Sequence, residues 1–307
     1  YNLAKMGNIY VVGAGKGAAS ITEALENILG DRIRGGLIIE KRGHEYKLNR
    51  INVIEASHPI PDEAGVKGSK EIVEIANSAK KSDLVFACIT GGCSALMTLP
   101  AEGISLEDVQ KVTDLLLKCG AVIEEINTVR KHISRINGGR LAKCIHPAEV
   151  ISLIVVDEVA GLPWGPTVPD TTTFADAVSV LKRYDLWEKV PDSVGKHIEQ
   201  ADPSQDTPKI EDFKRKGIKA HNLVLANSET VCEAAKKRAE ELGFNFMILS
   251  TVVEGESREV GVVLASIAKE VEKNGRPLKP PCVLIAGGET TVTIIREHGQ
   301  GGRNQEL

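Results

Sequence analysis

Short apolar segments rich in β-branched residues alternate along this chain with longer segments in which apolar residues recur every three or four positions. The short segments are typical of strands buried on both faces, and the longer ones have the period of amphipathic helices. This alternation predicts an α/β fold built on a parallel sheet. The predicted strands are 9–12, 36–39, 52–55, 84–89, 150–156, 222–226, 246–250, 282–286 and 291–295. The predicted helices are 22–29, 63–79, 106–119, 175–184, 229–242 and 258–273.

Two segments interrupt this alternation. The polar stretch 201–217 contains Pro203 and Pro208 and is typical of a surface connector. The stretch 274–282, NGRPLKPPC, holds three prolines before a new strand and is the expected domain boundary. We therefore predict a Rossmann-like parallel-sheet α/β domain over residues 1–278 and the start of a second α/β domain over residues 279–307. Because the final residues GGRNQEL begin a helix and then stop, we expect the intact protein to continue.

The composition argues against several classes of protein. Hydrophobic residues make up 42% and charged residues 26% of the chain, as in a globular protein. A net charge of −4 and an aromatic content of 4% do not favour nucleic-acid binding, and no apolar run reaches the roughly 18 residues of a membrane span. The six cysteines form no CxxC pair, which argues against a zinc site and fits a reducing, cytoplasmic compartment.

The first glycine-rich loop, VVGAGKGAAS, joins the first predicted strand to a helix. Backbone N–H groups of Gly15 and Gly17 at a helix N-terminus are suited to binding phosphate, and Lys16 adds a positive charge. The same loop fits the loose dinucleotide fingerprint, and Glu40 ends the second strand where an acid binds ribose. A tight turn without a ligand is the plain structural alternative.

Glycines also follow two other predicted strands. Gly91, Gly92 and Ser94 follow the strand 84–89, where close backbone approach and a hydroxyl group favour a bound phosphate or substrate. A plain helix N-cap is the alternative for Ser94. A second anion-binding loop is predicted near the end of the sequence, where glycines accompany an arginine. Its candidate residues are Gly288, Glu289, Gly302, Arg303 and Asn304.

Charged residues between these loops supply two further candidate sites, one basic and one acidic. Arg130 and Lys131 are predicted to neutralise a phosphate or carboxylate, although a solvated basic helix face would show the same pattern. Asp157 and Asp170 follow the buried strand 150–156 and are the predicted Mg²⁺ ligands, together with substrate phosphates. A helix N-cap is the alternative for Asp170.

These motifs, in this order, resemble the glycerate 2-kinase family, whose second domain is called MOFRL. The matching strings are VVGAGKGAAS, SHPIPDEAG, GGCSALMTLP, INTVRKHISRINGGRLA, GPTVPDTTTFADA, ANSETVCEAA, EGESREVG, GGETTVTI and GGRNQEL, within residues 9–307. The resemblance implies two Rossmann-like domains and transfer of the γ-phosphate of ATP, with Mg²⁺, to the 2-hydroxyl of D-glycerate. It also implies that Lys16 is the active-site lysine and that Arg303 is the catalytic arginine of the second domain. His58 and Asp62 match a motif for which it implies no role.

One loop departs from the family pattern. Leu162 stands where relatives carry an aspartate, and LPWGPTVPD replaces ASGPTVPD, which weakens the case for metal binding there. Two alternatives stay open. One is an NAD(P)-dependent hydroxypyruvate reductase, which needs a catalytic histidine paired with a carboxylate. The other is a non-catalytic phosphate-sensing domain. The expected partners are D-glycerate and ATP, and a homodimer is left open.

Overall fold

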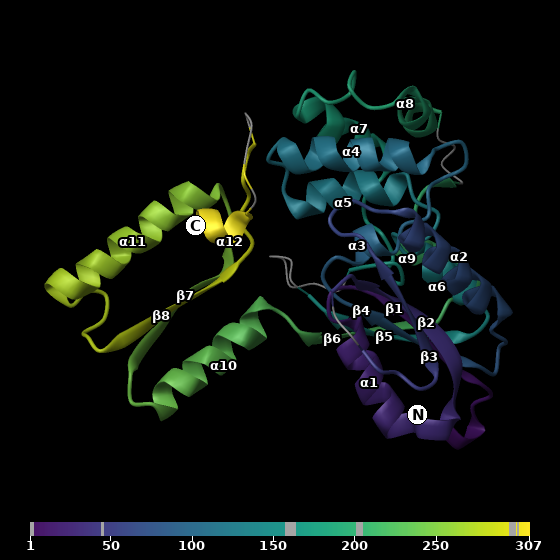
Figure 1. The fold of residues 1–307 in the computed structure, drawn as a ribbon, viewed down its shortest axis with the longest axis horizontal. Coiled ribbons are helices and arrows are strands. Elements are labelled where there is room, and N and C mark those ends of the chain that lie inside the picture. Colours follow the sequence, from purple (N-terminus) through teal and green to yellow (C-terminus); the bar gives the residue numbers. More distant parts are fainter. Residues whose placement is uncertain (1–2, 44–45, 157–163, 201–204, 295–298, 300) are drawn as a thin grey trace. The chain divides into compact units, whose positions relative to one another are not determined.

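Figure 1 shows the computed structural model, which describes residues 3–43, 46–156, 164–200, 205–294, 299 and 301–307. Its largest feature is a six-stranded sheet in the order β3-β2-β1-β4-β5-β6. The pairs β1–β2, β2–β3, β1–β4 and β4–β5 are parallel. The strands are Ile9–Ala14 (β1), Ile33–Lys41 (β2), Ile51–Ala56 (β3), Leu84–Ile89 (β4), Glu149–Val155 (β5) and Ala220–Ala226 (β6). The predicted α/β fold with a parallel sheet is confirmed.

The most apolar strands lie in the middle of this sheet. All six residues of β4 are buried, and in β1 only Tyr10 is partly exposed. In the edge strand β6 every second residue is exposed, and Leu223 and Leu225 are each 51% exposed. Burial of apolar surface stabilises a fold by roughly 25 cal/mol per Å². The continuous apolar runs of the sequence therefore mark the centre of the sheet.

Helices pack against the strands of this sheet. Helix α1 contacts β1, β2 and β4, and α2 contacts β1, β2 and β3. Asp62 is the N-cap of α2, and its Oδ1 accepts a hydrogen bond from the Gly65 N–H (3.0 Å), a donor that the helix start leaves unpaired. The helical segments before β6 are Leu3–Lys5 (η1), Ala18–Leu29 (α1), Gly30–Arg32 (η2), Glu63–Ser78 (α2), Cys93–Leu96 (α3), Leu106–Lys118 (α4), Ile123–His132 (α5), Arg140–Ile145 (α6), Phe174–Arg183 (α7), Asp192–Glu199 (α8) and Ile210–Lys216 (α9).

The chain divides into two compact units. The first comprises Tyr1–Leu115, Glu124–Val155 and Pro163–Leu225, and the second comprises Leu116–Ile123, Val156–Leu162 and Ala226–Leu307. In the second unit β7 pairs in parallel with β8, and α10 packs against both strands. The elements after β6 are Ser228–Glu241 (α10), Asn245–Val253 (β7), Ser257–Asn274 (α11), Cys282–Gly288 (β8) and Arg303–Glu306 (α12).

The compact units and the predicted domain boundary fall at different places, and the predicted boundary stays a prediction. We expect the boundary at residues 274–282, but the strands on either side of this segment are hydrogen-bonded neighbours, with Asn245 opposite Cys282. The units instead divide between Leu225 and Ala226, at the end of β6. Proline fixes the backbone and removes an N–H donor, so a proline cluster also suits a stiff turn inside a unit.

Two local predictions are wrong. No strand covers the described residues 291–294, because the loop before α11 holds this segment: Thr291 N–H donates to Gly255 O (2.9 Å) and Thr293 N–H to Glu256 Oε1 (3.0 Å). The stretch 201–217, expected to be a connector, contains helix α9. Helix α9 is short and mostly charged, and only Phe213 among its residues is buried, so its amphipathic pattern is weak in the sequence.

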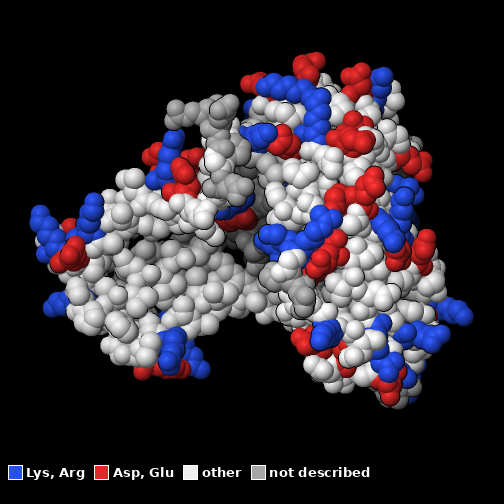
Figure 2. All heavy atoms as spheres, in the orientation of Figure 1, with Lys and Arg blue, Asp and Glu red and all other residues white. Residues whose placement is uncertain are grey.

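Charged side chains of both signs are interspersed on the face of the molecule shown in Figure 2. No continuous basic band is visible among the described residues on that face, in keeping with the net charge of −4. Within the described ranges, none of the helices is both long and apolar enough to cross a membrane.

Gly36 in β2 tests how tightly the strands pack, since a Cβ there would lie 1.8 Å from the carbonyl oxygen of Val11. We predict that Gly36→Ala lowers the free energy of unfolding by about 3 kcal/mol, because neither strand can shift without disturbing the sheet. The matched control is Gly195→Ala in α8, where a Cβ meets nothing within 4 Å and which should gain about 0.5 kcal/mol. Urea unfolding measures both values, and equal effects would contradict this account.

Candidate active site

Two loops at the carboxyl ends of neighbouring strands form the centre of the candidate site. One loop follows β1 and the other follows β4, and these two strands pair side by side. From β1 the sheet extends through β2 to β3 on one side and through β4 to β5 on the other. Open parallel sheets bind ligands beyond the strand ends where the strand order reverses in this way.

Hydrogen bonds lock these two loops together. The Lys16 N–H donates to Gly91 O (2.8 Å), and the Gly17 N–H donates to Thr90 Oγ1 (3.0 Å). Gly15 has a φ of +140°, and a Cβ there would lie 2.1 Å from Thr90 Oγ1, so glycine is required. Its own N–H donates to Ile39 O (3.1 Å). The N–H groups of Gly15 and Gly17 are thus engaged within the protein and do not form the predicted phosphate cradle.

Glu40 stabilises the start of α1. It is fully buried at the end of β2, and its Oε2 accepts a hydrogen bond from the Ala19 N–H (3.0 Å). Helix α1 has no acidic residue in its first turn and no side-chain N-cap, so Glu40 supplies the negative charge that a helix N-terminus favours. A carboxylate committed to this helix is not placed to bind a ribose. The dinucleotide interpretation of the loop therefore loses its key residue.

Lys16 is exposed on the locked loop and lies next to His58. The point where a Cβ of Gly92 would stand is 3.0 Å from His58 Nε2 and 3.4 Å from Lys16 Cγ. Burial, followed by the charges of Lys16, Arg130 and Lys41, lowers the pKa of His58 from 6.5 to about 4. Three cations thus act on one neutral histidine, and the positive potential here favours a bound anion.

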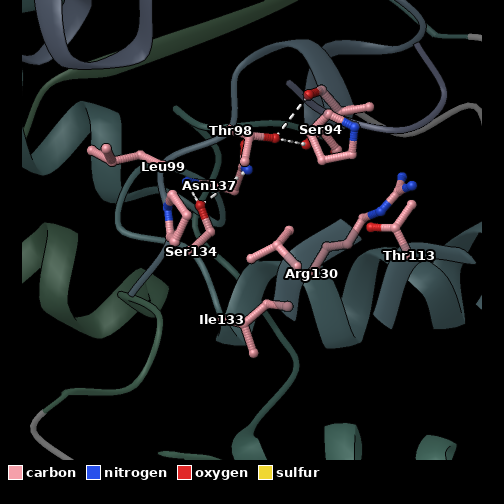
Figure 3. A pocket seen from close by; sticks show the side chains of 12 residues that line it. Ser94, Thr98, Leu99, Thr113, Arg130, Ile133, Ser134 and Asn137 are labelled. Atoms are coloured by element: carbon pink, nitrogen blue, oxygen red, sulfur yellow. Dashed lines mark hydrogen bonds between the residues drawn. The ribbon is translucent and has the colours of Figure 1, made fainter. Parts of the chain in front are cut away.

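Ser94 and Arg130 line a narrow pocket (Figure 3). The volume of the pocket is about 10 Å³, which is room for one water molecule. Arg130 projects from α5 and is only 8% exposed; burial lowers its pKa to about 10, so it stays charged at neutral pH. Its buried Nη2 makes no hydrogen bond to any described residue. Arg130 is therefore a fixed buried charge with an open donor, not part of a solvated helix face.

Lys131 and Asp170 pair with each other. Lys131 Nζ lies 2.6 Å from Asp170 Oδ1, and the side chain of Asp170 is only 3% exposed. The Thr172 hydroxyl donates to the same carboxylate at 3.0 Å. The charge of Lys131 is therefore matched by a carboxylate within the protein.

The predicted Mg²⁺ ligands do not form a metal site among the described residues. Asp157 lies outside the described ranges, and Asp170 is committed to Lys131 and Thr172. Within the part of the chain that the structure describes, no group of three or more His, Cys, Asp or Glu side chains is placed to hold a metal ion. Asp170 is therefore held within the protein and does not fit the expected magnesium site, while Asp157 stays a prediction.

His132 pairs with a carboxylate but has no open face. Its ring is fully buried, with Nδ1 2.7 Å from Thr128 O and Nε2 2.9 Å from Asp206 Oδ1. Both ring nitrogens are engaged within the protein, so neither can donate to a substrate carbonyl. His132 and Asp206 thus form a histidine–carboxylate pair of the kind that a reductase needs, but the histidine ring is buried and not accessible to a substrate.

The second unit brings together two of its predicted residues. Arg303, the first residue of α12, forms an ion pair with Glu289, which follows β8. Gly288 has a φ of +148°, and a Cβ there would lie 2.2 Å from Val253 O, so this glycine allows β7 and β8 to approach. Gly302 and Asn304 are exposed beside Arg303. The charged centre of this loop is therefore the Glu289–Arg303 pair.

Comparison with known proteins identifies the family. A family model described as "Domain of unknown function (DUF4147)" matches residues 1–199. The "Glycerate 2-kinase" of Pyrococcus horikoshii is 47% identical over 98% of this chain and 68% of its own length. The chain belongs to the glycerate kinase family. A second glycerate kinase relative, the "D-glycerate 2-kinase" of Thermotoga maritima, is 41% identical over 97% of this chain and 70% of its own length.

The fold agrees with that of a glycerate kinase of known structure. The crystal structure of glycerate kinase from Thermotoga maritima matches with a TM-score of 0.77 at 39% identity, covering 99% of this chain and 71% of that chain. The protein is therefore an enzyme of the glycerate kinase type. Membership of the glycerate kinase family also accounts for the order of the motifs along the sequence.

Sequence reasoning missed Thr90, which accepts the Gly17 N–H and so holds the two loops together. Its signal is its place between an apolar strand and Gly91, where a short side chain with an acceptor can reach a neighbouring loop. His58 is present in a quoted motif, but its position against Gly92 depends on a contact between distant parts of the sequence.

Glu40→Gln tests the assignment of Glu40 to helix stabilisation. We predict that it lowers the free energy of unfolding by about 1 kcal/mol, because the start of α1 loses a buried negative charge. The KM for the nucleotide should stay within about twofold of wild type, because Glu40 contacts the helix rather than a ligand. Thermal unfolding and steady-state kinetics measure the two effects, with Glu55→Gln on the exposed side of β3 as control. Unchanged stability together with a large rise in this KM would reverse the assignment.

Proposed function

We propose that the protein transfers the γ-phosphate of ATP to the 2-hydroxyl of D-glycerate and so forms 2-phosphoglycerate. Relatives named as glycerate 2-kinases, 47% and 41% identical, support this activity. The observation that carries it is the arrangement of Lys16, Lys41 and Arg130 around His58, beside the loops where the strand order reverses. Both substrates are anions, and phosphoryl transfer depends mainly on positioning and on neutralising charge on the equatorial oxygens.

Lys16 is the residue proposed to contact the transferring phosphoryl group. Its backbone is fixed by the hydrogen bond to Gly91, while its side chain is exposed. A cation held on a fixed loop needs little reorganisation when negative charge develops in the transition state. Gly92 and Ser94 form the adjoining turn, against which the acceptor is proposed to bind.

Arg130 is proposed to bind a substrate anion from its buried position in the pocket. Its open Nη2 donor and its buried charge favour the carboxylate or phosphate of a bound substrate. Because the pocket has room for about one water molecule, this contact runs through a single bridging water. Lys131 is proposed to support Arg130 indirectly, since its pair with Asp170 fixes the same end of α5.

Arg303 is proposed to bind ATP phosphates within the second unit. A guanidinium presents several donors in a fixed fork, so one edge can hold Glu289 while another binds phosphate oxygens. Gly302 and Asn304 are proposed to adjoin the same phosphates. No step is assigned to Mg²⁺, because Asp170 is engaged by Lys131.

The reductase alternative lacks comparable support among the described residues. Glu40 caps α1 rather than standing open to a ribose, and His132 is closed on both ring nitrogens. The kinase function accounts for Lys16 and Arg130 as cations that meet two anionic substrates.

Lys16→Ala tests the proposed function most simply. We predict a fall in kcat of roughly 100-fold, because a fixed positive charge is lost from the transferring group. The melting temperature should be unchanged, since Lys16 is exposed. ADP release that depends on D-glycerate is the measurement, and Lys70→Ala on the exposed side of α2 is the control. Turnover of Lys16→Ala close to that of wild type would remove Lys16 from the mechanism.

Arg303→Lys tests the proposed fork in the second unit. We predict a loss of at least about 10-fold in kcat/KM for ATP, because an ammonium group lacks the planar fork that offers separate edges to Glu289 and phosphate. Glu289→Gln keeps an acceptor for the guanidinium and should lose less. The same ADP assay applies, and full activity of Arg303→Lys would show that bidentate binding is not used.

A further inference from the structure

His58 stands at the proposed site with its ring nitrogens open. It is half-buried, and its ring makes no hydrogen bond to any residue that the structure describes. A Cβ on Gly92 would lie 2.9 Å from His58 Cδ2 and 3.0 Å from Nε2, so the missing side chain at Gly92 lets the ring rest against this turn. A histidine held in this way is placed to meet a ligand.

The charged groups that face His58 come from three elements. Lys16 belongs to the loop after β1, Lys41 ends β2, and Arg130 belongs to α5. Burial is the main cause that favours the neutral form of the imidazole, and these three cations add to it. A neutral imidazole has one nitrogen that accepts a hydrogen bond and one that donates.

The carboxylate in the same segment, Asp62, is engaged elsewhere. It accepts hydrogen bonds from the N–H groups of Ser57 (3.2 Å) and Gly65 (3.0 Å), and it pairs with Arg42 at 2.6 Å. Asp62 therefore caps α2 and shapes the segment around His58, and its charge is already balanced by Arg42.

We propose, on the basis of the kinase function above, that His58 binds the hydroxyl group of the acceptor and takes up its proton. In this step the hydroxyl oxygen forms a bond to the γ-phosphorus. The bond from that phosphorus to the ADP oxygen breaks, and its electron pair stays with ADP. The proton passes from the hydroxyl to an imidazole nitrogen and then to solvent.

The binding of substrates makes His58 a better base. In the free protein its pKa of about 4 makes it a weak acceptor of protons. The negative charges of ATP and the acceptor offset Lys16, Lys41 and Arg130, which removes part of the cause of the low pKa. The same field that attracts the anions is thus weakened when they bind, and the imidazole becomes more basic when the proton must be accepted.

The expected pH dependence of activity follows from the role of His58 as proton acceptor. His58 must be neutral to accept the proton, so activity is present above its pKa and is lost as the pH falls through it. We expect kcat/KM, which reports the free enzyme, to lose activity near pH 4. We expect the acid limb of kcat, which reports the complex, to lie at a higher pH, because the bound anions offset the cations while burial, the larger cause of the low pKa, remains.

His58→Gln and His58→Ala test this assignment. Glutamine keeps the bulk and a hydrogen-bonding amide but cannot take up a proton, so both variants should lose about 100-fold in kcat. The acid limb of kcat should disappear in both, and the KM for ATP should change by less than about threefold. His221→Gln, at an exposed histidine of β6, should keep wild-type kcat and the wild-type limb. A His58→Gln enzyme with wild-type kcat, or with the acid limb intact, would overturn the proposal.

A second readout does not depend on turnover. In an NMR titration of the histidine rings, inorganic phosphate should raise the pKa of His58 by about one unit. An unchanged His58 pKa in an enzyme that phosphorylates D-glycerate would overturn the role of His58 alone. Absence of D-glycerate-dependent ADP formation in the wild-type protein would overturn the kinase function and this role with it.

Discussion

The N–H groups of Lys16 and Gly17 donate to the loop after β4, and the position of Lys16 at the site follows from these two bonds. They tie the ends of two neighbouring strands at the point where the sheet reverses its order. The glycines of the first loop serve this contact, since a side chain at Gly15 would overlap Thr90. Lys16 is therefore fixed at its backbone and exposed only at its side chain, which is what a charge directed at a ligand requires.

Arg130, a second cation of this region, is fixed from within the protein. Arg130 is buried near the end of α5, and a buried charge persists only where its surroundings hold it in place. The end of α5 is held by Lys131, which pairs with Asp170, and by His132, which contacts Asp206. Arg140 adds a hydrogen bond to Lys131 O (2.8 Å). Lys131 and His132 thus hold the end of α5 that carries Arg130.

The sequence predicts the sheet well because its strands are buried on both faces, and burial leaves continuous apolar runs such as residues 84–89. Its proline cluster at 277, 280 and 281 does not by itself locate a domain boundary, because proline marks a turn whether or not a domain ends there.

Within the site, the sequence identifies Lys16 and Arg130 as charged residues but does not show which side chains they meet. The commitment of Glu40 to α1 and of Asp170 to Lys131 joins residues that lie 21 and 39 positions apart. Such pairs depend on how the elements pack, which periodicity along the chain does not report. A glycine pattern alone therefore cannot distinguish a loop that binds phosphate from one that binds a neighbouring loop.

The central claim is that the cations around His58 serve phosphoryl transfer to D-glycerate and not hydride transfer. The most direct measurement follows one enzyme preparation by ³¹P NMR with ATP and D-glycerate, and by NADPH absorbance with hydroxypyruvate. The account predicts a new phosphomonoester signal coupled to the proton on carbon 2, formed in step with ADP, and no oxidation of NADPH. Oxidation of NADPH without a phosphomonoester would contradict it.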